Sequence, residues 1–186
     1  MKTPRGDHVR PTQDMVREAL FSMLMVDVPE SRFLDLFAGT GSVGIEAMSR
    51  GAAEVYWVEG DHGVAKTTSR NVAEIVGGGA ESRVICSDVM RWVKTMGRNM
   101  AFDIVFADPP YADARQDGCD GGLVALADAL AKGGVIASDG LLITEMPIAA
   151  PVVSLDGWRL LRDRTYGKTR LVVRQRLGAD TKEEGV

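Results

Sequence analysis

Apolar runs of strand length alternate with helix-like segments along most of this chain. The predicted strands are short, and they cover 32–37, 55–59, 83–86, 102–107 and 141–146. The segments between them carry helical periodicity or helix-capping residues, at 42–50, 61–76, 89–96 and 123–131. This alternation predicts an α/β fold with a parallel sheet and helices on both faces, because each crossover between parallel strands must pass over one face of the sheet.

The two ends of the chain add elements of another kind. An N-terminal helix is predicted from Thr12, a good N-cap residue, up to a stop at Pro29. Its apolar stripe consists of Val16, Ala19, Leu20, Met23 and Leu24. Two further strands, 158–164 and 169–177, have only a turn at 166–167 between them, so they predict an antiparallel hairpin at one sheet edge. The 186 residues therefore suit one domain over 1–177, with an arm and helix at 1–27 and a flexible tail at 178–186.

Composition excludes several classes of protein. Hydrophobic residues make up 45% of the chain and charged residues 26%, which is typical of a globular protein and excludes disordered, collagen-like and coiled-coil chains. No apolar run approaches the ~18 residues of a membrane span, and the N-terminus lacks the apolar core of a signal peptide. Cys86, Cys119 and the two histidines show no metal-ligand spacing. We therefore expect a cytoplasmic protein without a metal, in which Cys86 is a small buried residue.

Basic residues are concentrated at the two ends of a chain whose net charge is −4. Positions 157–176 hold seven basic residues against Asp163 alone, and Lys2, Arg5, Arg10 and Arg17 belong to the N-terminal arm and helix. The acidic total argues weakly against nucleic-acid binding. The distribution leaves two interpretations open, which are solvated strand faces and a surface that contacts phosphates.

A glycine-rich segment between the first predicted strand and its helix is the first motif that carries chemistry. It reads Asp35-Leu-Phe-Ala-Gly39-Thr-Gly41-Ser-Val-Gly44, with the G-x-G-x-x-G spacing that lets a backbone and a helix N-terminus approach a ligand. Glu59 ends the second strand, where a carboxylate can bind ribose hydroxyls. Asp88 can accept a hydrogen bond from an adenine amine, cap the next helix, or do both. Nicotinamide dinucleotides and S-adenosylmethionine both contain such a ribose, so both cofactors stay open at this point.

The segment Asp108-Pro109-Pro110-Tyr111 follows the fourth predicted strand and distinguishes the two cofactors. An exocyclic amine of a nucleobase is a poor nucleophile, because its lone pair is delocalised into the ring. The Asp108 carboxylate and the Pro109 carbonyl are adjacent acceptors that can localise this lone pair, and the prolines fix the backbone beforehand. The Tyr111 ring can stack on a base. The alternative is a rigid turn with no catalytic role.

Together these motifs resemble those of the bacterial small-subunit (16S) ribosomal RNA guanine-N2 methyltransferases, a branch of the class I S-adenosylmethionine-dependent fold. The resemblance rests on the segments 10–21, 35–52, 108–111 and 166–171 and extends over about 2–176. It implies one Rossmann-like domain with a seven-stranded, mostly parallel sheet and an antiparallel C-terminal hairpin. It also implies methyl transfer from S-adenosylmethionine to the 2-amino group of a guanine in small-subunit ribosomal RNA or a partly assembled subunit. We expect a monomer, because the sequence shows no additional interface element.

The resemblance and the motifs together assign site residues. The expected catalytic residues are Asp108, Pro109, Pro110 and Tyr111. The expected cofactor-binding residues are Asp35, Phe37, Ala38, Gly39, Thr40, Gly41, Gly44, Glu59, Asp88, Val89 and Asp108. The expected contacts to RNA are Arg10, Pro11, Thr12, Arg17, Tyr111, Tyr166, Lys168 and Arg170. Trp57 and Trp92 are expected to be core residues.

Three other functions remain compatible with parts of the sequence. An adenine-N6 methyltransferase of DNA or RNA would use the same chemistry at Asp108, and it would differ in the groups that read the base edge. A nicotinamide-dependent oxidoreductase is compatible with the glycine-rich segment alone. A non-catalytic RNA-binding module that holds S-adenosylmethionine is disfavoured by the intact segment at Asp108.

Overall fold

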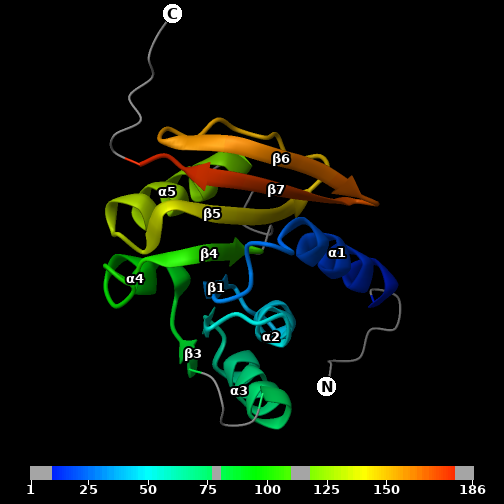
Figure 1. The fold of residues 1–186 in the computed structure, drawn as a ribbon. Coiled ribbons are helices and arrows are strands. Elements are labelled where there is room, and N and C mark those ends of the chain that lie inside the picture. The colour runs from blue at the N-terminus through cyan, green and yellow to red at the C-terminus, as the bar shows by residue number, and fades with distance from the viewer. Residues whose placement is uncertain (1–9, 77–80, 110–117, 179–186) are drawn as a thin grey trace, which may run out of the picture.

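The computed structural model describes residues 10–76, 81–109 and 118–178, with five helices and seven strands in that part of the chain (Figure 1). The helices are α1 (Arg10–Met23), α2 (Ser42–Ser49), α3 (His62–Val76), α4 (Val89–Lys94) and α5 (Gly118–Lys132). The strands are β1 (Arg32–Leu36), β2 (Glu54–Glu59), β3 (Glu81–Cys86), β4 (Phe102–Ala107), β5 (Ile136–Pro147), β6 (Trp158–Tyr166) and β7 (Thr169–Arg176).

The strands form one sheet in the order β3-β2-β1-β4-β5-β7-β6. Strands β1 to β5 run parallel, and β7 pairs antiparallel with both β5 and β6. This is the mostly parallel seven-stranded sheet with a C-terminal hairpin that the sequence predicts. The order reverses at β1, so the carboxyl ends of β1 and β4 meet at a topological switch point, where α/β proteins bind ligands.

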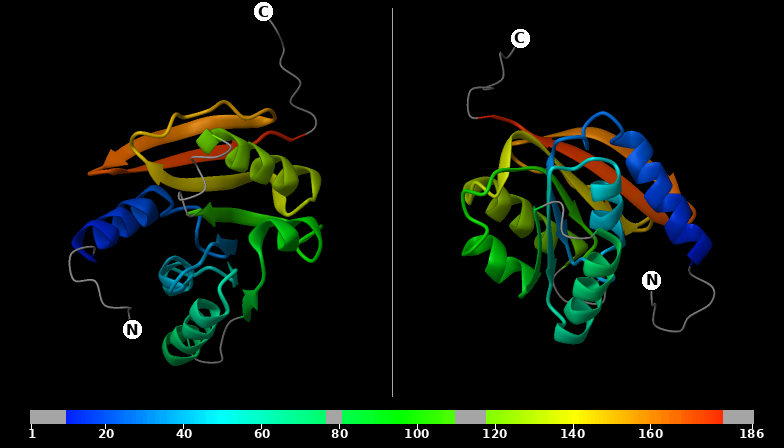
Figure 2. Two further views of the ribbon diagram at one scale, coloured as in Figure 1. Left: turned by 180° about the vertical axis from the view of Figure 1, so that it is seen from behind. Right: turned by 60° about the horizontal axis from the view of Figure 1, so that its bottom comes forward.

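Each face of the sheet has its own hydrophobic core, because successive strand residues point to opposite faces. Phe33, Trp57 and Phe106 belong to the core under α1, α2 and α3. Leu34 and Val105 belong to the core on the other face, under α4 and α5. Figures 1 and 2 show these two helical layers on either side of the strands.

Two local predictions are wrong. Helix α1 begins at Arg10, so Thr12 lies inside its first turn and is not the N-cap. Pro11 is compatible with this earlier start, because the N–H groups of a first turn have no partner within the helix. Cys86 is exposed, not buried, because it ends β3, an edge strand with a neighbour on one side only.

The basic C-terminal hairpin is less solvated than its composition suggests. Arg174 is buried, and its guanidinium donates to the Thr144 hydroxyl and to the Val153 carbonyl. Burial lowers the pKa of Arg174.

Among the described helices, none combines the length and hydropathy of a membrane-crossing segment.

Candidate active site

The glycine-rich loop connects the end of β1 to the start of α2. Phe37, Gly39 and Gly41 have φ angles of 59°, 54° and 80°, a region that L residues with side chains rarely adopt. The chain therefore turns sharply here, and α2 begins directly after Gly41 with its first N–H groups at the carboxyl edge of the sheet.

Side chains from two elements, β2 and α3, hold the backbone of this loop. One Glu59 oxygen accepts from the Gly39 N–H at 2.9 Å, and the other accepts from the Asp61 N–H at 2.9 Å. From α3, the Thr68 hydroxyl donates to the Gly39 carbonyl at 2.6 Å, and the Asn71 amide donates to the Thr40 carbonyl at 2.9 Å. Glu59 therefore positions the loop and also lies where a ribose contact is predicted.

Sequence reasoning missed the two residues of α3, Thr68 and Asn71. Both are buried, although both are polar. They lie three residues apart on the face that also buries Ala65 and Val72. Two short polar side chains within an otherwise apolar helical stripe are the signal that could have identified them.

The third glycine of the motif is required by packing. A Cβ atom at Gly44 would lie 2.3 Å from Trp57 Nε1, and the Trp57 indole donates to the Gly41 carbonyl at 3.1 Å. Beneath the loop, the buried Asp35 carboxylate accepts from the Gly44 N–H at 3.0 Å. Burial raises the pKa of Asp35 well above its usual range. Asp35 thus holds the backbone of the loop from the protein interior, through its hydrogen bond with Gly44.

Asp88 follows β3 and begins α4. Its carboxylate accepts from the Arg91 N–H at 2.7 Å, which makes it the N-cap of that helix. The side chain is exposed, so the capping role leaves it open to a ligand, and Val89 behind it is buried. The predicted contact of Asp88 with an adenine amine stays a prediction.

Asp108 lies directly after β4, at the switch point. Ala107 pairs with Leu36 of β1, so Asp108 follows beside the start of the glycine-rich loop. Water reaches its side chain, yet the surrounding protein disfavours the charged form and raises the pKa of Asp108 to about 6. Pro109 is half-buried beside it. Pro110 and Tyr111 lie outside the described residues.

A second carboxyl group near Asp108 was missed by sequence reasoning. Glu145 follows Thr144 on β5, and Thr144 pairs with Ala107 of β4. Desolvation and the charge of Asp108 raise the pKa of Glu145 to about 7. No short motif marks Glu145, because only the register between β4 and β5 brings it to Asp108.

The residues predicted to contact RNA lie on three elements. Arg10, Pro11 and Thr12 form the start of α1. Arg17, later in that helix, pairs with Asp14 at 2.8 Å.

Tyr111 lies outside the described residues. The remaining predicted RNA contacts lie at the carboxyl end of β5, because Pro147 pairs with Thr169. Tyr166 ends β6 and Lys168 lies in the turn of the hairpin, at this edge of the sheet. Arg170 donates to the Ala150 carbonyl and pairs with Asp163, so its side chain is occupied within the protein.

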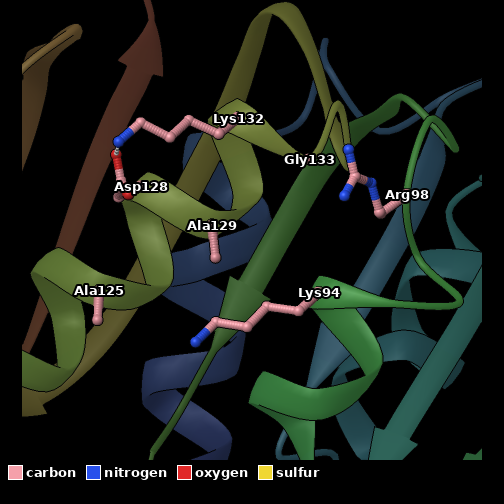
Figure 3. A pocket seen from close by; sticks show the side chains of 7 residues that line it. All are labelled: Lys94, Arg98, Ala125, Asp128, Ala129, Lys132 and Gly133. Carbon is pink, nitrogen blue, oxygen red and sulfur yellow. Dashed lines mark ion pairs between the residues drawn. The ribbon is translucent and has the colours of Figure 1, made fainter.

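A separate pocket between α4 and α5 lies at the opposite, amino-terminal edge of the strands (Figure 3). Its volume is about 330 Å³, and its walls are Lys94, Arg98, Ala125, Asp128, Ala129, Lys132 and Gly133. Lys132 is paired with Asp128 at 2.8 Å. Lys94 and Lys132 end their helices, where cations stabilise the helix dipole, so these charges have a structural role.

In the part of the chain that the structure describes, no cluster of side chains could hold a metal ion.

Comparisons with known proteins agree with this geometry. The family model for conserved hypothetical protein 95 matches residues 1–175. Ribosomal RNA small subunit methyltransferase D of Escherichia coli (strain K12) is 32% identical over 178 residues, which are 95% of this chain and 84% of the relative.

Solved structures show the same fold. The putative methyltransferase yhhF from Escherichia coli has a TM-score of 0.79 at 31% identity and covers 95% of this chain and 92% of its own. A magnesium protoporphyrin IX methyltransferase from Synechocystis PCC 6803, solved with bound SAH, has a TM-score of 0.68 at 14% identity and covers 94% of this chain and 90% of its own. This second likeness concerns the fold alone.

Proposed function

This chain belongs to the conserved hypothetical protein 95 family, and from that premise we propose that it methylates the 2-amino group of a guanine in small-subunit ribosomal RNA. The methyl donor is S-adenosylmethionine. The single observation that carries the proposal is the position of Asp108 at the carboxyl end of β4, beside the glycine-rich loop. Acceptors for the amine and a cradle for the cofactor thus lie at the same switch point.

The residues present fit S-adenosylmethionine. Among the described residues, a Cβ atom at Gly39 would meet only the Phe37 carbonyl, at 4.0 Å, so these residues leave space for a ligand in front of the loop. Glu59 would bind the ribose hydroxyls, the loop N–H groups the amino-acid part, and Asp88 with Val89 the adenine. When bound, this cofactor supplies an electrophilic methyl group next to a positively charged sulfur.

The residues after β4 act on the substrate amine. The Asp108 carboxylate and the Pro109 carbonyl oxygen accept the two N–H bonds of that amine, which directs its lone pair towards the methyl carbon. Formation of the C–N bond would be matched by loss of the C–S bond of the cofactor, whose sulfur would keep the electron pair. The nitrogen gives up one proton, and Asp108 is the adjacent base that accepts it. This preorganisation and the alignment of reactants account for the rate increase, with no covalent intermediate on the protein.

Mass mapping of the product tests the proposed function. Unmodified small-subunit ribosomal RNA, naked or in reconstituted small subunits, is incubated with the protein and labelled S-adenosylmethionine, then digested to nucleosides. We expect label in N2-methylguanosine, and the two substrates distinguish free RNA from an assembled subunit. Label in N6-methyladenosine, or no label with either substrate, contradicts the proposal. A ribosomal substrate also agrees with the expected cytoplasmic location.

Substitution of Glu59 should weaken binding of the cofactor. Glu59→Ala removes the ribose contact and releases the Gly39 N–H, so the binding free energy should fall by about 1.5–3 kcal/mol, the range for hydrogen bonds to a charged group. Isothermal titration with S-adenosylmethionine measures this change. Glu46→Ala is the control, because Glu46 forms only a surface pair with Arg50 on α2. If a folded Glu59→Ala protein binds S-adenosylmethionine with unchanged affinity, Glu59 does not bind the ribose hydroxyls.

Activity should depend on the ionisation of Asp108. Only the carboxylate is an acceptor for both the N–H bond and the proton, and burial raises the pKa of Asp108 to about 6. Protonation of Asp108 alone should therefore lower kcat/KM as the pH drops through about 6, by roughly tenfold per unit well below that pH. The side chain of Asp108→Asn does not titrate, so the fall in kcat/KM near pH 6 should vanish from the residual activity of this variant. If Asp108→Asn still shows this fall in kcat/KM near pH 6, the fall is due to another titrating group.

A further inference from the structure

Glu145 and Asp108 lie on one face of the sheet. Ala107 and Thr144 are paired neighbours on β4 and β5, so the next residues in the chain are Asp108, directly after β4, and Glu145 on β5. Phe106 and Ile143, which come one position before Ala107 and Thr144, both pack into the core under α1. Because side chains alternate between faces, Asp108 and Glu145 both point to the α1 side, at the carboxyl edge of adjacent strands.

The base edge next to the reacting amine differs between guanine and other purines. Guanine presents an N1–H donor beside its 2-amino group, whereas adenine and 2-aminopurine present an unprotonated N1, which is an acceptor. A carboxylate accepts only, so it binds the guanine edge and repels the lone pair of an unprotonated N1.

We propose that the Glu145 carboxylate accepts the N1–H of the target base, while Asp108 accepts from the adjacent 2-amino group, and that Glu145 thereby selects guanine. This inference rests on the proposed function and adds to it the residue that reads the base edge. Neighbouring parallel strands lie about 4.8 Å apart, so two carboxylates on such strands can reach adjacent atoms of one base.

The surroundings of Glu145 favour a role in binding over a role in folding. Its charged form is disfavoured, because desolvation and the nearby Asp108 raise the pKa of Glu145 to about 7. An N–H donor of the substrate, together with the positive sulfur of the cofactor, restores the charged form at the moment of binding.

The test compares two RNAs that differ in one base, at its N1 and C6 positions. A small-subunit RNA fragment, or a reconstituted subunit that contains it, carries either guanine or 2-aminopurine at the position that mass mapping identifies. Both bases offer the same 2-amino nucleophile, but only guanine has the N1–H. The wild-type protein should prefer guanine in kcat/KM by roughly 10–100-fold. Glu145→Gln should reduce this preference by about tenfold, because an amide can also donate to an unprotonated N1.

The intrinsic difference in reactivity between the two bases cancels in the comparison of variant with wild type. Asp139→Asn is the matched control, since it removes an exposed carboxylate from the other end of the same strand. Its preference for guanine should equal that of the wild type. Glu145→Gln replaces a partly buried acid with a neutral isostere, so we expect it to fold.

Two outcomes separate this inference from the proposed function. If the wild type methylates guanine and Glu145→Gln keeps the wild-type preference over 2-aminopurine, Glu145 does not read the base and the inference is overturned. If the wild type methylates no guanine in either substrate, the proposed function itself fails. A loss of preference in Glu145→Gln but not in Asp139→Asn supports the inference.

Discussion

Asp108→Ala should lower the single-turnover rate of methyl transfer by ~10²–10³, the usual effect of removing one preorganised acceptor from an active site. The affinity for S-adenosylmethionine should change little, because the contacts that hold the glycine-rich loop come from Glu59, Thr68 and Asn71. Rapid-quench methylation of RNA under single-turnover conditions isolates the chemical step from product release.

Asp108→Asn is the control for this experiment. The amide oxygen still accepts one hydrogen bond from the amine, but it carries no charge and takes up no proton, so its rate should lie between those of the wild type and Asp108→Ala. A wild-type chemical rate in Asp108→Ala would restore the interpretation of this segment as a rigid turn. A matching loss of cofactor affinity would instead assign Asp108 to the cofactor site.

Trp57→Ala should lower the free energy of unfolding by about 3–5 kcal/mol, the range for removing a large aromatic ring from a core. The Trp57 side chain has no exposed surface, and its indole contacts Gly41 and Gly44. Without the ring, the glycine-rich loop loses both a hydrogen-bond donor and the surface on which it rests. We therefore expect weaker binding of S-adenosylmethionine as well. Urea unfolding and isothermal titration measure the two effects.

Trp92→Ala is the matched control for Trp57→Ala. Trp92 is 2% exposed, and it lies on α4, from which it packs into the core on the other face of the sheet. Its loss should destabilise the protein to a similar extent, yet leave the cofactor affinity of the folded molecules near the wild-type value. Equal loss of affinity in both variants would mean that Trp57 acts only through general stability.

The architecture follows from patterns that are local in the sequence. Each strand is an apolar run bounded by turn residues, and the absence of a helix between β6 and β7 makes that pair antiparallel. The glycine-rich loop, Glu59 and Asp108 were predicted because each ends a strand, and all parallel strands end at the same edge. Residues whose position depends on chain order alone are thus accessible to sequence reasoning.

Residues whose role depends on packing were not accessible. Thr68 and Asn71 contact the loop because of how α3 lies against α2, and Glu145 reaches Asp108 through the register of β4 with β5. The strand pattern around Arg174 gave no sign that this side chain is buried. Cys86 was wrongly expected to be buried, because the place of β3 at the sheet edge depends on strand order.

The reversal of strand order at β1 also bears on how such proteins diversify. The predicted cofactor contacts other than Asp108 come from the chain before β4, whereas Asp108, Glu145 and the hairpin turn come from β4 onward. A lineage can therefore change the groups that act on the target base in its second half, while its first half retains the cofactor contacts together with the predicted RNA contacts of α1. The boundary near Phe102, where β4 begins, is accordingly the natural crossover point for chimaeras between relatives that modify different bases.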